Sequence, residues 1–248
     1  MRIDKREAGE LRPITIETDF IESAHGSVLV SCGKTRLICT AMLEDRVAPF
    51  LSGSGQGWLT AEYAMLPAST PSRKMREGRK GVGVDGRAME IQRMIGRSLR
   101  AGMDLKALGE RTLTIDCDVI QADGGTRTAA ITGGFVAAAL AVDRLLTSEL
   151  IVTSPVRHMV AAVSAGVVGG EILLDLCYEE DARADSDINV VFNELGQLLE
   201  VQGTAERAPF ETSQLQTVLS MTDAAVQIII EKQKEALGEA WDRILKKD

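Results

Sequence analysis

The spacing of apolar and polar positions predicts a group of strands and then a helix in the first part of the chain. Alternating or β-branched segments predict four strands, at 14–20, 27–31, 36–42 and 58–65. Gly33 and Lys34 separate the second and third strands and suit a hairpin turn. An apolar stripe at helical spacing, opposite a row of arginines, predicts a helix over about 87–101.

The later part of the chain loosely repeats this order. A strand at 111–121 leads into an alanine-rich helix at about 127–146. The pattern then predicts strands at 158–168, 171–178, 188–192 and 197–201. A last helix covers 212–245, with Gly238 as a break. Strands followed by a helix, twice over, predict an α+β protein of two similar halves in a single compact domain, with the halves at about 1–105 and 106–248.

Composition indicates a globular protein of a reducing compartment. The chain has 248 residues, of which 45% are hydrophobic and 26% are charged, as is usual for globular proteins. No C-x-x-C pair occurs among Cys32, Cys39, Cys117 and Cys177, so we expect free thiols. The first residues lack an apolar signal region, and the longest apolar run, 135–142, is short for a membrane span. We therefore expect a cytoplasmic protein with no membrane partner.

Basic residues are concentrated in one segment of an acidic chain. The net charge is −8, yet residues 73–100 contain nine basic and three acidic residues. Such a segment favours a polyanion such as a nucleic acid as a ligand, with a solvated charged face as the alternative. A long polar loop in this region carries basic residues that we predict to bind a phosphate backbone, namely Arg73, Lys74, Arg76, Arg79 and Lys80. Aromatic residues make up only 4% of the chain, so base-specific stacking is not expected.

A glycine-rich turn between the 111–121 strand and the following helix is a candidate anion site. It reads Asp-Gly-Gly-Thr-Arg at 123–127. A turn that opens a helix leaves backbone N–H groups unpaired, and the helix dipole adds positive potential there. Arg127 is disfavoured in a first helical turn unless an anion such as phosphate lies beside it. The earlier helix start repeats this arrangement, with Asp85 as its expected N-cap and Arg87 in its first turn. The two arginines are therefore predicted to converge on one anion. The alternative is a pair of ordinary turns with solvated or locally paired arginines.

Five carboxylates lie within the nine residues 179–187, which we expect to form a loop directly before a predicted strand. Carboxylates suit Mg²⁺, which binds one or two of them and keeps several waters, and they also suit a general acid. A solvated acidic turn is the alternative. Neither His25 nor His158 lies in a pattern with a serine or cysteine nucleophile, so no nucleophilic side chain is predicted.

Specific motifs are spread over nearly the whole chain. They are RxDxR and RP near the start, GWLTAEYAMLP at 57–67, REGR at 76–79, DGR at 85–87, IDCDVIQADGGTRT at 115–128 and LDLxYxED at 174–181. These motifs resemble the RNase PH family of phosphorolytic 3′→5′ exoribonucleases, or tRNA nucleotidyltransferases. The resemblance implies an RNase PH-like fold and a ring-shaped homo-hexamer, a trimer of dimers. It also implies trimming of tRNA precursors and rRNA with inorganic phosphate as co-substrate, reversible release of nucleoside 5′-diphosphates, and use of Mg²⁺.

The resemblance also assigns roles to residues. The family holds phosphate with an arginine and a Gly-Thr-Arg triplet, which fall here on Arg87, Gly125, Thr126 and Arg127. Its acidic pair, expected to act in catalysis and to bind Mg²⁺, falls on Asp181 and Asp187. Its arginine-rich loop, associated with tRNA binding, falls on Arg73, Arg76 and Arg79.

Two other functions are alternatives to phosphorolytic exoribonuclease activity. A catalytically silent RNA-binding ring subunit of an exosome-like assembly typically lacks the phosphate arginines or the acidic pair, whereas this sequence has both. A hydrolytic two-metal ribonuclease needs more carboxylates and no phosphate-binding turn. The products separate these functions, because phosphorolysis releases diphosphates and hydrolysis releases monophosphates.

Overall fold

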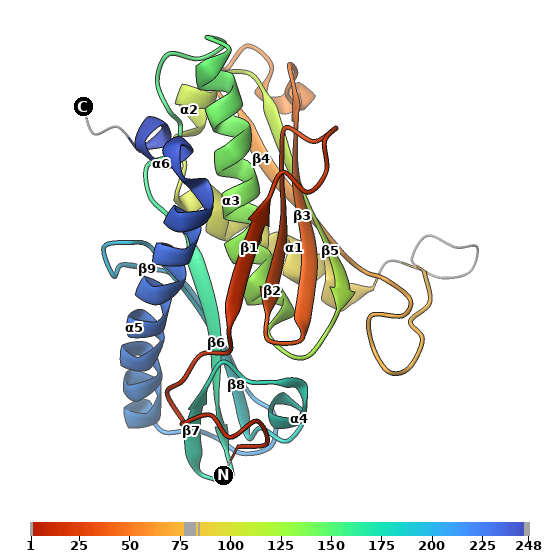
Figure 1. Cartoon of the computed structure of the whole chain (residues 1–248), viewed down its shortest axis with the longest axis vertical. Coiled ribbons are helices and arrows are strands. Elements are labelled where there is room, and N and C mark those ends of the chain that lie inside the picture. The colour runs from red at the N-terminus through yellow and green to blue at the C-terminus, as the bar shows by residue number, and fades with distance from the viewer. Residues whose placement is uncertain (1, 77–82, 84, 246–248) are drawn as a thin grey trace.

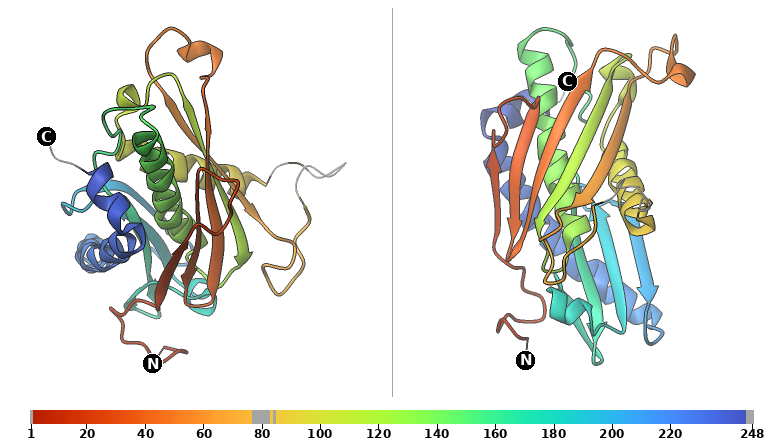
Figure 2. Two further views of the ribbon diagram at one scale, coloured as in Figure 1. Left: turned by 45° about the horizontal axis from the view of Figure 1, so that its top comes forward. Right: turned by 90° about the vertical axis from the view of Figure 1, so that its right-hand side faces the viewer.

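Two β-sheets share one central helix (Figures 1 and 2). The computed structural model describes residues 2–76, 83 and 85–245. The first sheet has the strand order β1-β2-β3-β5-β4, and the second has the order β7-β6-β8-β9. The strands are β1 (Ile14–Thr18), β2 (Gly26–Cys32), β3 (Thr35–Glu44), β4 (Trp58–Met65), β5 (Thr112–Gln121), β6 (Ala161–Val168), β7 (Glu171–Leu174), β8 (Ser186–Phe192) and β9 (Leu198–Ala205).

Helices cover both sheets. They are α1 (Gly86–Ala101), α2 (Leu105–Leu108), α3 (Thr126–Thr147), α4 (Tyr178–Asp181), α5 (Thr212–Leu237) and α6 (Glu239–Ile244), with a short 3₁₀ turn, η1 (Pro49–Leu51). α1 packs on β4, α3 packs on β2 and β3, and α5 packs on β6 of the second sheet. The prediction of a break at Gly238 is confirmed, because this residue separates α5 from α6 with a left-handed φ of 52°.

The strand pairing brings distant parts of the chain together. β1, β2 and β3 form an antiparallel meander, and β5 lies antiparallel to β3 and parallel to β4. The second sheet is antiparallel throughout. Cys39 on β3 lies opposite Cys117 on β5, and both are buried free thiols, as the sequence predicted.

The central helix α3 is buried along most of its length, because strands of both sheets pack against it. It is rich in alanine and glycine, which allow close approach of the surrounding backbone. By length and composition α3 is apolar enough to cross a membrane, but 78% of its most apolar window is buried inside the protein. It therefore serves as the core helix of this fold.

The α+β class and the arrangement in two similar halves are confirmed, but three features differ from the sequence prediction. The strand expected at 171–178 ends at Leu174, because Asp175 adopts a left-handed φ of 52° that a strand cannot contain. The acidic segment expected to be a loop begins in the helical turn α4. β5, placed by the sequence in the second half, pairs with β3 and β4 of the first sheet, since strand pairing does not follow sequence order.

Gly26 is expected to be essential for the packing of β2 on α3. A Cβ at this position would lie 2.0 Å from the carbonyl oxygen of Ala137, so the two backbones would have to separate. We expect Gly26→Ala to lower the free energy of unfolding by about 3 kcal/mol, measured by urea denaturation. The control is Gly86→Ala, because among the described residues, apart from its chain neighbours and the backbone of its own helix, no atom lies within 4 Å of a Cβ there. Equal unfolding midpoints for both variants would contradict the close approach.

Candidate active site

A cavity of about 470 Å³ lies where the starts of α1 and α3 meet α4 and β8. This volume is within the range of small-molecule sites in proteins. The predicted site residues found in its lining are Lys74, Arg87, Gly125, Thr126, Arg127, Asp181 and Asp187. Segments far apart in the sequence thus contribute opposite charges to one space, which makes this cavity the candidate site.

The start of α3 forms one wall and exposes backbone donors. Gly124 and Gly125 have left-handed φ values of 74° and 65°, and a Cβ at Gly124 would lie 2.3 Å from the carbonyl oxygen of Leu176. Gly125 is the N-cap of α3, and none of the described side chains caps this helix start. The first-turn N–H groups and the helix dipole therefore favour an anion at this wall of the cavity.

Arg127 is held in place by the neighbouring elements. Its side chain is only 12% exposed, and Nη1 donates a hydrogen bond of 2.6 Å to Oε1 of Gln202 on β9. The same nitrogen lies 3.5 Å from the Glu90 carboxylate on α1, and the Gln202 amide in turn donates to Glu90. Because these contacts restrict its rotamers, the guanidinium is pre-organised at the start of α3.

Thr126 is also fixed by a side chain that the sequence did not identify. Its hydroxyl lies 2.8 Å from the hydroxyl of Tyr63 on β4. Tyr63 is buried, and burial raises the pKa of its phenol, while the nearby charges of Arg87 and Arg127 oppose that rise. The neutral phenol is therefore a stable hydrogen-bonding partner for Thr126.

The start of α1 also contributes to the cavity. The predicted N-cap is confirmed, because the Asp85 side chain accepts a hydrogen bond of 3.1 Å from the backbone N–H of Arg87. Nζ of Lys74 lies 3.6 Å from the same carboxylate. Arg87 lines the cavity, so the two arginines predicted to converge do share one space.

Asp181 on α4 and Asp187 on β8 form the acidic side of the cavity. Burial raises the pKa of Asp187 to about 6, and the charge of Asp181 contributes to this rise, against the opposing charge of Arg127. Burial also raises the pKa of Asp181, and the charge of Arg87 opposes this effect. Nδ2 of Asn189 donates a hydrogen bond of 3.0 Å to Asp187 and so orients its carboxylate. The charged form of each carboxylate is therefore destabilised, and a bound cation would stabilise it.

The donor set fits a magnesium ion. Mg²⁺ prefers carboxylate oxygens, usually takes one or two from the protein and completes its shell with water and substrate oxygens. Asp181 and Asp187 supply two such carboxylates in one cavity, and burial raises the free energy of the charged form of each. Among the residues that the structure describes, there is no group of three or more acidic, histidine or cysteine side chains that could enclose a metal.

The predicted RNA-binding residues are only partly at the cavity. Lys74 lines it, whereas Arg73 and Arg76 are exposed on the neighbouring loop and do not contribute to the lining. Figure 1 shows this loop projecting from the body beyond the start of α1. Arg79 and Lys80 lie outside the described residues.

Comparison with known proteins identifies the family at the sequence level. The model of the 3′ exoribonuclease family, domain 1, matches residues 10–142, and that of domain 2 matches residues 158–225. The chain is 55% identical over 240 residues to Ribonuclease PH of Bacillus velezensis, covering 96% of this chain and 98% of that protein. It is 53% identical over 241 residues to Ribonuclease PH of Bacillus subtilis, covering 97% and 98%.

Solved structures share the fold at lower identity. A chain of the Archaeoglobus fulgidus exosome with RNA bound to the active site has a TM-score of 0.79 and 21% identity, covering 93% of this chain and 92% of that chain. Rice Rrp46 has a TM-score of 0.76 and 18% identity, covering 95% and 100%. The family models and the bacterial relatives agree with the resemblance drawn from the motifs, and the chain belongs to the RNase PH family of 3′ exoribonucleases.

Proposed function

We propose that inorganic phosphate binds between the starts of α1 and α3 and carries out the cleavage catalysed by this phosphorolytic 3′ exoribonuclease. The observation that supports this most directly is the shared cavity. Arg87, Arg127 and the uncapped start of α3 offer positive potential in this cavity, and Asp181 and Asp187 line the same space. A phosphate held there would be gripped by guanidinium and backbone donors, which are its preferred partners.

The reaction needs positioning more than covalent chemistry by the protein. An oxygen of the bound phosphate attacks the phosphorus of the last phosphodiester in the RNA. A new P–O–P bond forms, the bond to the preceding 3′ oxygen breaks, and that oxygen takes up a proton. The product is a nucleoside 5′-diphosphate and an RNA shortened by one nucleotide. Because a pyrophosphate-type bond replaces a phosphodiester, the reaction is reversible, and diphosphates extend the RNA. Arg87, Thr126 and Arg127 hold the attacking group and stabilise the developing charge.

Asp181 and Asp187 have two proposed tasks. Together they hold Mg²⁺, which when bound supplies positive charge to the transferring phosphoryl group. One of them also gives a proton to the departing 3′ oxygen. Burial raises the pKa of Asp187 to about 6, and a carboxyl that titrates near neutral pH can deliver a proton while it is not coordinating the cation.

The basic loop is proposed to bind the body of the RNA. Arg73 and Arg76 are exposed, and Lys74 lines the cavity at the edge of the same loop. This arrangement suits an RNA whose 3′ end enters the cavity and whose backbone follows the loop, as in tRNA precursors and rRNA. Arg79 and Lys80 are assigned to the same surface from the sequence alone.

We further propose a homo-hexamer, a trimer of dimers, in the cytoplasm. The free thiols of all four cysteines are consistent with a reducing compartment. The Archaeoglobus fulgidus relative is a chain of an exosome, so this fold occurs in multi-subunit assemblies. The alternative of a silent RNA-binding subunit is less favourable, because both cavity arginines and both aspartates are in place.

Removal of the Arg127 guanidinium should abolish phosphate-dependent trimming. We expect Arg127→Ala to reduce the rate by at least about a hundredfold while the melting temperature changes little. The measurement is the release of labelled nucleotides from tRNA with a 3′ extension, with and without phosphate, resolved by thin-layer chromatography. Arg97→Ala is the matched control, because Arg97 also pairs with a β9 side chain, Glu200, but does not line the cavity. Wild-type rates for Arg127→Ala, or monophosphates as the wild-type product, would contradict phosphorolysis at this site.

Neutralising Asp187 should slow turnover and stabilise the fold. Its carboxyl has an ordinary pKa of 3.8 when unfolded and about 6 when folded, so the folded state binds more protons between these values. The charge therefore costs stability above pH 6, and the cost disappears as the pH falls below 3.8. We expect Asp187→Asn to raise the free energy of unfolding at pH 8 by up to about 3 kcal/mol, and to lower kcat by orders of magnitude while RNA binding is retained. Asp242→Asn, outside the cavity lining, is the control. Equal kcat for wild type and Asp187→Asn would remove Asp187 from the reaction.

Replacing the loop arginines should weaken RNA binding in a salt-dependent way. We expect substitution of Arg73, Arg76 and Arg79 by alanine to lower tRNA affinity. The slope of log affinity against log salt should become shallower by about 0.7 to 0.9 for each phosphate that the loop no longer neutralises. Fluorescence anisotropy with labelled tRNA measures both quantities. Lys232→Ala, on the exposed face of α5, should leave the slope unchanged. An unaltered slope in the triple variant would exclude the loop from the RNA path.

A further inference from the structure

A cluster of buried charges adjoins the cavity, and the proposed reaction does not use it. It joins the segment before β1 to the segment around α4 and consists of Arg2, Arg6, Arg12, Asp175 and Glu180. We call it the N-terminal ion cluster. Each of these side chains is at most 7% exposed. Burying these charged side chains lowers the stability of the fold unless each one is paired with good hydrogen-bond geometry. The presence of the cluster therefore needs a physical explanation.

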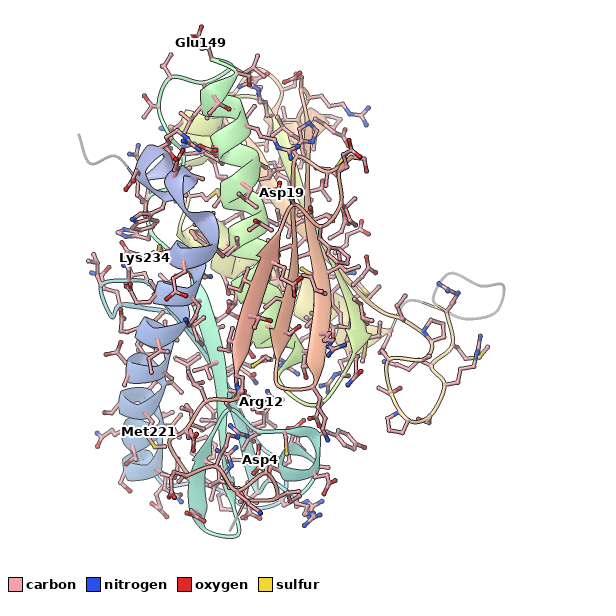
Figure 3. The ribbon with its side chains drawn as sticks, viewed as in Figure 1. Asp4, Arg12, Asp19, Glu149, Met221 and Lys234 are labelled. Atoms are coloured by element: carbon pink, nitrogen blue, oxygen red, sulfur yellow. The ribbon has the colours of Figure 1, made fainter. Side chains whose placement is uncertain are left out.

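Arg12 connects this cluster to the start of α3. Its guanidinium donates to both carboxylate oxygens of Asp175, at 3.0 and 2.6 Å. The same guanidinium donates to the carbonyl oxygen of Asp123 at 2.5 Å and to that of Gly124 at 3.4 Å. Figure 3 shows Arg12 where the chain passes from the N-terminal segment into β1, above α4 and β7. One buried side chain therefore holds two successive peptide groups of the phosphate-binding turn.

These contacts determine where the turn's N–H groups point. A peptide unit is planar and trans, so its N–H points away from its C=O. With the carbonyls of Asp123 and Gly124 directed at Arg12, the N–H groups of Gly124 and Gly125 must point to the side away from Arg12. Both glycines line the cavity. Arg12 thus orients the backbone donors without contacting the cavity itself.

Thr35 makes a second connection to the same turn. Its hydroxyl donates to the carbonyl oxygen of Gly124 at 2.7 Å and accepts from the N–H of Asp123 at 2.9 Å. Thr35 is fully buried at the first position of β3. The turn is therefore held from two independent elements, and the hydroxyl can be removed with little change of shape.

The other end of the cluster holds the acidic side of the cavity. Arg2 donates to both carboxylate oxygens of Glu180, at 2.8 and 2.7 Å. Glu180 also accepts a hydrogen bond of 3.1 Å from the backbone N–H of Cys177, which closes the first turn of α4. Glu180 directly precedes Asp181, so fixing its side chain restricts the backbone that carries this aspartate.

Asp175 links the two ends in an unfavourable backbone conformation. Its φ of 52° is unusual for a residue other than glycine and costs energy that the surrounding contacts must offset. Its backbone carbonyl accepts from Arg2 and Arg6, at 3.1 and 3.0 Å. Burial raises the pKa of its carboxyl, but the hydrogen bonds and charge of Arg12 outweigh this effect, and the pKa lies below its usual range. The Asp175 carboxylate is therefore charged at neutral pH and keeps its ion pair and hydrogen bonds with Arg12.

We propose that Arg12 and Glu180 are positioning residues of the active site. Arg12 aims the backbone donors of the phosphate-binding turn, and Glu180 sets the position of Asp181. The segment 2–12, far from the cavity in sequence, is then part of the catalytic apparatus. This inference rests on the proposed phosphate site at Arg87 and Arg127.

A purely structural ion cluster would affect stability alone, so kinetics separate the two roles. Arg12→Lys keeps the charge opposite Asp175, but an ammonium cannot reach both carbonyls and the carboxylate as a guanidinium does. Thr35→Val removes the second connection and keeps the shape. We expect each variant to raise the KM for phosphate roughly ten- to a hundredfold with a smaller change in kcat, measured at saturating RNA. Glu180→Gln should instead lower kcat about tenfold with little change in the KM for phosphate, because Glu180 acts through Asp181.

The matched control is Arg144→Lys at the far end of α3. Arg144 also donates to a backbone carbonyl, that of Ala24 at 2.7 Å, and lies near a carboxylate, that of Asp19 at 3.6 Å. We expect this variant to change the melting temperature without changing either kinetic constant. If Arg12→Lys and Thr35→Val lower only the melting temperature and leave the KM for phosphate unchanged, the positioning role is wrong.

Arg127→Ala, measured in parallel, separates this inference from the function on which it rests. A normal KM for phosphate in Arg127→Ala would overturn the phosphate site and with it the role of Arg12. A raised KM in Arg127→Ala, with normal values in Arg12→Lys and Thr35→Val, would overturn the positioning role alone. If Arg12→Lys does not fold, Thr35→Val decides the question for the turn by itself.

Discussion

The burial of α3 between two sheets is the constraint on which the site depends. A helix covered on both sides cannot shift or rotate without disturbing both sheets, so its first turn stays in one place. Only four residues connect β5 to α3, and two of them are glycines in left-handed conformations. The unpaired backbone donors at the start of α3 are therefore aimed at one point by the core of the protein.

The charged side chains that line the cavity are only partly balanced by one another, so charged ligands would stabilise them. Burial raises the free energy of the charged forms of Asp181 and Asp187, and the charges of Arg87 and Arg127 offset only part of this increase. An anion at the helix starts and a cation between the carboxylates would both be favourable, because each supplies the charge that its side of the cavity lacks. By contrast, the charges of Arg243 and Asp143 are paired with each other.

The cavity is supported by residues of three separate segments. Arg12 reaches the turn from the N-terminal segment and Thr35 from β3, while Glu180 holds the first turn of α4. Such support matters because a displacement of about 1 Å in a bound group can cost a hundredfold in rate. It also gives a reason for keeping buried ion pairs, which by themselves contribute little net stability.

The sequence by itself determined the order of the strands and of the long helices α1, α3 and α5, the N-cap at Asp85, the glycine turn before Arg127 and the break at Gly238. These features follow from local periodicity and from the conformations that glycine alone adopts easily. The sequence motifs also indicated the RNase PH family. Only the tertiary structure decided that Gln202 would hold Arg127 from 75 residues away, that Tyr63 would contact Thr126, and that Asp175 would end a strand in a left-handed turn. Such contacts leave no periodic trace in the sequence, because they arise only when packing of the two sheets around α3 brings distant segments together.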